Sequence, residues 1–106
     1  MILCNTETLP KKRIIENYGL VQGSTVRAKH LGRDIMAGLK NIVGGELAGY
    51  TELLEDARKE ATDRMIEDAR AKGANAIINV RFSTTSVTQG AAELFAYGTA
   101  VLTEDE

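Results

Sequence analysis

Two residues of this chain, Cys4 and His30, belong to the types that bind soft or borderline metal ions, and each is the only one of its type. A thiolate and an imidazole favour zinc or copper(I) over magnesium or calcium. A closed zinc site usually has four protein ligands, so one copy of the chain does not supply a complete cysteine and histidine site. Several copies around a symmetry axis could supply one. We therefore predict Cys4 and His30 as the metal-binding residues, with ligands contributed by several subunits.

Both residues also have an explanation that needs no ligand. Cys4 ends a short apolar run at positions 2–4, where a cysteine packs as a small hydrophobic residue. His30 lies in a stretch with lysine and arginine nearby, which is typical of an exposed segment. A catalytic cysteine and histidine dyad would need the two side chains side by side, and their spacing does not show this. No other nucleophile with a base and no carboxylate pair stands out, so we do not expect an enzyme.

Length and composition predict one ordinary globular domain. The chain has 106 residues, 43% of them hydrophobic and 26% charged, which is enough for a single core. The net charge of −2 gives no electrostatic reason to expect a nucleic-acid partner. No apolar run reaches the roughly 18 residues of a membrane span, and the N-terminus does not resemble a signal peptide. One cysteine cannot form an internal disulfide, which fits a cytoplasmic location.

A long helix from Glu52 to Lys72 is the element that organises the chain. Its apolar residues recur every four positions, the spacing of one buried helix face: Leu53, Ala57, Ala61, Met65 and Ala69. Gly73 is expected to end this helix in a left-handed conformation. A shorter helix is predicted near Asp34–Val43, before Gly44-Gly45.

Extended segments lie on both sides of these helices. We predict an edge strand at positions 2–4, an extended piece at 14–16, and strands at Tyr18–Ala28, Ala76–Thr88 and Ala92–Thr103, with a turn at Gln89-Gly90. The last strand is apolar on both sides, and such a strand is usually covered on both faces. A 13-residue strand spans about 43 Å, which exceeds the roughly 35 Å diameter of a compact domain of this length. The hairpin should therefore bend, break or overhang, and an overhanging hairpin favours an interface with a neighbouring subunit.

Several short motifs resemble those of one family. They are Val21-x-Gly23, Arg33-Asp34 with Ala37-Gly38, Ile42-Val43-Gly44-Gly45-Glu46, Gly73-Ala74-Asn75-Ala76 and Tyr97-Gly98-Thr99-Ala100-Val101. On these residues the chain resembles the YbjQ-like family, small bacterial proteins of unknown function that are described as heavy-metal-binding. The resemblance covers nearly the whole chain. It implies an α+β fold of the dodecin-subunit type, with two helices packed on an antiparallel sheet, and ring-shaped homo-oligomers, as pentamers. It brings no ligand motif to place on these residues.

Two functions of different classes follow from these observations. The first is a homo-oligomeric binding protein that holds a heavy-metal ion or a small ligand at its subunit interfaces. The second is a structural or protein-interaction ring with no metal-binding or catalytic role. A metal titration followed by native mass spectrometry separates them, because only the first predicts a bound ion or molecule.

Overall fold

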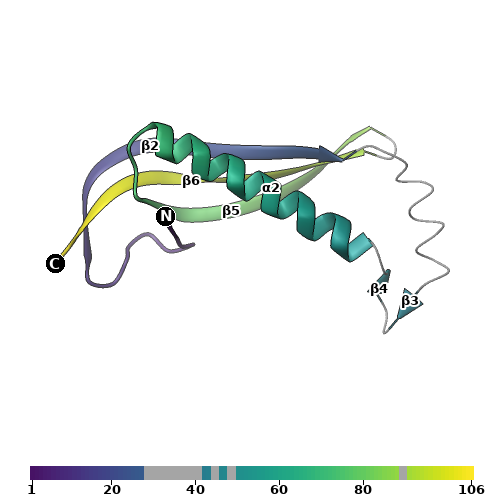
Figure 1. Ribbon diagram of the computed structural model, residues 1–106, viewed down its shortest axis with the longest axis horizontal. Helices are drawn as coiled ribbons and strands as arrows, with labels where there is room; N and C mark the ends of the chain where they lie inside the picture. The colour runs from purple at the N-terminus through teal and green to yellow at the C-terminus, as the bar shows by residue number, and fades with distance from the viewer. Residues whose placement is uncertain (28–41, 44–45, 48–49, 89–90) are drawn as a thin grey trace.

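One helix lies across a four-stranded sheet in the computed structural model of the protein, which describes residues 1–27, 42–43, 46–47, 50–88 and 91–106 (Figure 1). The sheet has the order β1-β5-β6-β2, and a separate two-stranded sheet pairs β3 with β4. The elements are β1 (Ile2–Leu3), β2 (Lys12–Arg27), β3 (Ile42–Val43), β4 (Glu46–Leu47), α2 (Tyr50–Ala71), β5 (Ala76–Thr88) and β6 (Ala91–Asp105). In this part of the chain, no helix has both the length and the apolar composition that crossing a membrane requires.

The sheet is mixed, and this corrects the antiparallel sheet predicted above. Strand β6 is antiparallel to β2 and to β5, but β1 runs parallel to β5. The reason is that β1 is not part of a hairpin with β5. It meets that strand where the chain leaves the helix, with the N–H of Ile2 donating to the carbonyl of Asn75 and the N–H of Cys4 to that of Ile77. The α+β class itself is confirmed.

The shorter predicted helix falls mostly on residues 34–41, which lie outside the described residues. Its predicted end is wrong, because Ile42 and Val43 form β3 and pair with Leu47 and Glu46 of β4. Both residues of β3 are β-branched and favour extended structure. The predicted turn at Gln89-Gly90 also lies outside the described residues.

The long predicted helix is confirmed, as α2. Ala57, Ala61, Met65 and Ala69 are at most 2% exposed, and they form the face that packs on the sheet. The helix approaches β2 so closely at Gly23 that a Cβ atom built there would lie 2.2 Å from the carbonyl oxygen of Ala61. Only glycine fits this crossing, which explains the glycine of the Val21-x-Gly23 motif.

The helix ends as its Gly-Ala-Asn-Ala sequence predicts. Gly73 has φ of 92°, and the N–H of Ala74 donates to the carbonyl of Ala69 at 3.1 Å, which satisfies a free carbonyl of the last turn. Asn75 then joins this end to β6, because its side-chain amide donates to the carbonyl of Thr103 at 2.9 Å and accepts from the N–H of Thr103 at 2.8 Å. Gly73, Ala74 and Asn75 of the motif therefore each have a structural role.

A β-bulge in β5 changes which side chains share a face of the sheet. Asn79 has φ of 53°, and the register between β5 and β6 shifts between Ile78 and Arg81. We expected strict alternation along the strand Ala76–Thr88, which would place Ile78 and Val80 on the same face. In the structure Val80 packs with the helix-side core, whereas Ile78 belongs to a second cluster. The prediction is wrong here because the bulge adds one residue to the strand.

The sheet is long and its cover is incomplete. The molecule measures 53 × 28 × 16 Å with a radius of gyration of 17.0 Å, whereas a compact domain of this length has about 13 Å. Large apolar side chains remain exposed along the sheet, among them Leu20 at 63%, Val26 at 55% and Phe82 at 50%. The hairpin of β5 and β6 accordingly spans most of the length of the molecule in Figure 1.

Candidate functional site

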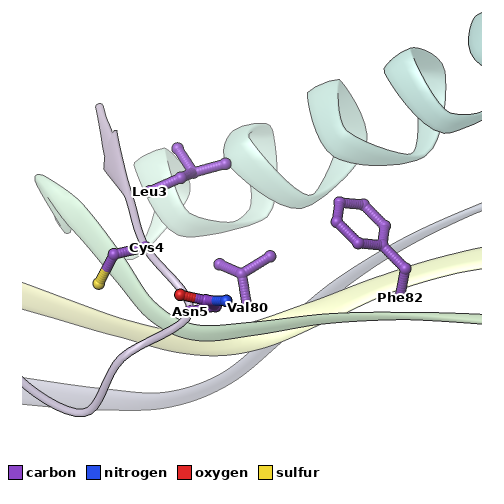
Figure 2. A pocket seen from close by; sticks show the side chains of 5 residues that line it. All are labelled: Leu3, Cys4, Asn5, Val80 and Phe82. Carbon is purple, nitrogen blue, oxygen red and sulfur yellow. The ribbon is translucent and has the colours of Figure 1, made fainter.

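An apolar hollow of about 310 Å³ lies along β5, where β1 leaves this strand (Figure 2). It is lined by Leu3, Cys4, Asn5, Val80 and Phe82. Figure 2 shows the side chains of Leu3, Val80 and Phe82 on the same side of β5, facing the side on which α2 lies. Its size is at the lower end of the range for small-molecule sites, which are mostly apolar with few polar groups. Asn5 supplies the polar side chain of this hollow.

The hollow results from the end of β1 and the bulge of β5. The N–H of Val80 donates to the carbonyl of Cys4 at 3.0 Å, and the N–H of Asn79 donates to the carbonyl of Thr6 at 3.0 Å. The guanidinium of Arg81 donates to the carbonyl of Asn5 at 2.9 Å. These bonds fix the segment that follows β1 against the bulge. The bulge in turn places Val80 and Phe82 on one face, so the hollow is built largely from local backbone geometry.

Cys4 borders the hollow, but its sulfur points away from it (Figure 2). The side chain packs against the cluster of Ala76, Ile78 and Val101 on the opposite face of the sheet. Its thiol lies 3.5 Å from the carbonyl oxygen of Thr6, to which it donates. Both features agree with a cysteine that packs as a small hydrophobic residue. The thiol is nevertheless only partly buried, so a ligand from another subunit could reach it.

The second predicted metal residue, His30, lies outside the described residues. Within the part of the chain that the structure describes, no group of three or more histidine, cysteine, aspartate or glutamate residues is placed to hold a metal ion. The described residues of one copy therefore bring fewer than two further ligands of these types to Cys4. A metal site that uses Cys4 needs residues from other copies or from the remainder of the chain.

The hollow was not predicted from the sequence. In the sequence, Val80 and Phe82 are ordinary residues of an alternating strand. Only one weak sequence signal indicates the bulge that changes the face on which they lie. That signal is Asn79, since asparagine tolerates a left-handed conformation better than most residues. The short strand itself was predicted at positions 2–4, but no signal in the sequence indicated that it leaves β5 beside the bulge.

The fold and the hollow define a small α+β protein with one described helix on a mixed sheet and an apolar site at the edge of that sheet. Within this class, the chain belongs to the YbjQ family, whose model, described as "Putative heavy-metal-binding", matches residues 1–104. The description gives a property but does not identify ligand residues.

Relatives of similar length occur in both bacteria and archaea. A UPF0145 protein of Hahella chejuensis is 71% identical over 104 residues, which are 98% of this chain and 100% of the relative. A UPF0145 protein of Archaeoglobus fulgidus is 59% identical over 101 residues, or 95% of this chain and 94% of the relative. The bacterial range predicted from the resemblance is therefore too narrow.

A solved structure supports the fold. It is a protein of unknown function from Pediococcus pentosaceus, assigned to the DUF74 family, and it matches with a TM-score of 0.68 over 98% of both chains. The two sequences are 13% identical, so this likeness concerns the fold alone.

Proposed function

We propose that the protein is a homo-oligomeric binding protein that holds a small ligand or a heavy-metal ion at its subunit interfaces. The observation that carries this proposal is the exposure of large apolar side chains along an elongated sheet. Leu20 and Val26 project from β2 on the face away from α2, and Phe82 projects from β5 beside the hollow. Leu20 and Val26 lie on one face of the sheet and Phe82 on the other. Apolar surface that gathers into a patch marks interaction sites on soluble proteins.

The amount of exposed surface agrees with assembly. The molecule exposes 6921 Å², whereas a compact 11.5 kDa monomer exposes about 5,800 Å². The difference, roughly 1,100 Å², is comparable with the approximately 800 Å² that each partner buries in a specific interface. The assembly that we propose is a ring of identical subunits. The resemblance implies that this ring is a dodecin-like pentamer with two helices in each subunit. We propose that it is located in the cytoplasm.

The hollow beside Phe82 is the proposed site for a small molecule. Its apolar lining and the single amide of Asn5 suit a compact, mainly apolar ligand with one hydrogen-bonding group. The hollow is open, so it gains a closed wall only when another subunit covers it.

The family description supports a metal ion as the other ligand class. Cys4 supplies the soft ligand, and copies of Cys4 and His30 from several subunits supply the remaining positions. Zinc or copper(I) suits such ligands. Binding weakens as pH falls, because protons compete with the metal for thiolate and imidazole.

Oligomerisation is tested by sedimentation velocity at micromolar concentration. We expect a single species at a multiple of the subunit mass. A species of 11.5 kDa alone would overturn the ring and every site that depends on an interface.

Ligand class is tested with two probes on the assembled protein. For metal, zinc affinity is measured by calorimetry with a competing chelator on the wild type, Cys4→Ser and His30→Ala. We expect both substitutions to weaken zinc binding, and equal affinities would exclude these residues as zinc ligands.

For the hollow, fluorescence of anilinonaphthalene sulfonate is measured on Phe82→Ala, with Phe95→Ala as the matched control on the other face of the sheet. If neither probe binds, the structural ring without a ligand replaces this proposal.

A further inference from the structure

The outer edge of β5 is paired along its first half only. The N–H of Val80 points outward, since it donates to Cys4 of the segment that follows β1. Outward groups alternate along a strand, so the N–H groups of Phe82 and Thr84 point the same way. Among the described residues, no strand pairs with this edge beyond Arg81. An open edge of this length is a template for a further strand.

The other edge of the sheet, formed by β2, is protected over its second half. The N–H of Gln22 donates to the carboxylate of Asp68 at 3.2 Å, and the carbonyl of Ser24 accepts from the guanidinium of Arg64 at 2.5 Å. Both charged side chains come from α2 and occupy backbone groups that an incoming strand would need. The second half of β2 is therefore not available for pairing.

The first half of β2 differs from the second half because it exposes large apolar side chains. Ile14 is 37% exposed and Ile15 48% exposed, and the register with β6 shifts between Ile14 and Glu16. The charged side chains beside them are engaged within the subunit, Lys12 with Asp105 and Arg13 with Glu104 of β6. This half of β2 consequently presents an apolar surface at the edge of the sheet.

We propose that the open edge of β5, from Phe82 to Thr88, binds the first half of β2 of a second copy of this chain. The inference rests on the proposed assembly and specifies its junction. The two surfaces are complementary, since exposed isoleucines meet an exposed phenylalanine and positions 82–88 carry no charge. They are also different surfaces, so each copy has one of each, and such head-to-tail contacts form rings when the rotation closes.

The register places the two surfaces at opposite ends of the sheet. Phe82 is level with Ala96 and Gly23, whereas Ile14 pairs with Thr103 near the end of β6. A junction between them therefore staggers successive subunits, as strands are staggered in closed barrels. The incoming strand also lies along the hollow beside Phe82 and covers its open side. The candidate ligand site is thus complete only when the neighbour is present.

Engineered disulfides test this junction directly. In a Cys4→Ser background, Thr84→Cys is combined in turn with Ile14→Cys, Ile15→Cys and Glu16→Cys, because a disulfide needs Cα atoms within about 7 Å. We expect at least one pair to give covalent multimers up to the size of the assembly, while each single variant stays uncross-linked. Dimers from Thr84→Cys alone would overturn the proposal in favour of pairing between two β5 edges.

A proline substitution provides the second test, read by sedimentation with circular dichroism as the check on folding. Thr84→Pro removes an outward N–H of β5, and we expect loss of the assembly with the helical signal retained. Gln22→Pro is the matched control, because it removes an outward N–H on the protected edge, and we expect it to assemble. A wild type that is monomeric would refute the assembly itself. An assembling wild type whose Thr84→Pro variant assembles equally well would overturn only this junction.

Discussion

Gly73 holds a conformation that other residues adopt at a cost. Its φ of 92° lies in the left-handed region, and a Cβ atom built there would lie 3.6 Å from the hydroxyl oxygen of Tyr18 and 3.9 Å from its ring, which are ordinary contacts. Gly73→Ala should therefore destabilise the protein by about 1 kcal/mol through backbone strain and not through a clash. Urea denaturation measures the change. Gly73→Asn is the control and should lose less stability, since asparagine tolerates the left-handed region. Equal losses of stability for the two variants would contradict the explanation from backbone strain.

Thr25 carries a buried hydroxyl that makes no hydrogen bond to any described residue. Thr25 is 2% exposed on the helix side of β2, and its Oγ1 has no partner in the part of the chain that the structure describes. Thr25→Val keeps the shape and removes the unpaired group, so we expect stabilisation of about 1 kcal/mol. Thr103→Val is the matched control, because the hydroxyl of Thr103 donates to Asn75 at 3.1 Å and its loss should destabilise. Thermal denaturation measures both changes in stability. If both variants were stabilised, or both destabilised, the explanation from the unpaired hydroxyl would be refuted.

Single residues were predictable where a local rule acts on them. The conformation of Gly73 follows from its place after a helix, and the packing of Cys4 follows from its apolar neighbours. Phe82 was not predictable as part of a hollow, because its surroundings depend on the bulge at Asn79 and on a strand from the other end of the chain. His30 lies outside the described residues, so its metal-binding role stays a prediction.

The contact between α2 and β2 depends on the absence of one side chain. A Cβ atom at Gly23 would lie 2.5 Å from the backbone nitrogen of Met65 as well as 2.2 Å from the carbonyl of Ala61. These are backbone atoms, so Gly23→Ala must displace the helix, and we expect a loss of about 1–3 kcal/mol. Ser24→Ala changes the neighbouring position on the opposite face and should cost less than about 0.5 kcal/mol. Comparable denaturation midpoints for the two variants would exclude the close crossing.

The join between the helix end and β6 depends on one amide. Asn75→Ala removes three hydrogen bonds to Thr103, a residue that is 7% exposed. The N–H and the hydroxyl of Thr103 then lose the acceptor that Asn75 provides. An unpaired buried group costs about 1–3 kcal/mol, which is the loss expected here. Asn75→Asp retains the accepting oxygen and should lose less. A midpoint for Asn75→Ala within error of the wild type would show that the amide does not secure this join.

Elements were predictable where the pattern repeats many times. The four-residue spacing in α2 and the alternation in β5 and β6 extend over many residues, so their positions were predicted to within three residues. The direction of β1 and the continuity of β2 were not. We predicted a break between an extended piece at 14–16 and a strand that begins at Tyr18, but the structure has one continuous strand, β2, with a register shift between Asn17 and Gly19. There Asn17 accepts a hydrogen bond from the N–H of Gly19 at 2.8 Å, and this local turn accommodates the irregularity without ending the strand.

At the scale of the whole molecule, no helix among the described residues covers the face of the sheet that carries Leu20. Leu20 is 63% exposed on the face away from α2. In a monomer, Leu20→Ser would change stability by less than about 0.5 kcal/mol. In the proposed assembly, the leucine loses contact with water, and burial of such a side chain contributes about 1.5–3 kcal/mol.

We therefore expect Leu20→Ser to raise the dissociation constant of the assembly at least tenfold, since about 1.4 kcal/mol corresponds to a factor of ten. Sedimentation equilibrium over a dilution series measures this constant. Leu54→Ser is the matched control, because Leu54 is 44% exposed on α2, which packs on the face of the sheet opposite Leu20. The proposed assembly would stabilise the folded subunit by mass action, so it also predicts that the thermal midpoint of the wild type rises with protein concentration. A concentration-independent midpoint, together with equal constants for the two variants, would show that the uncovered face is not an interface.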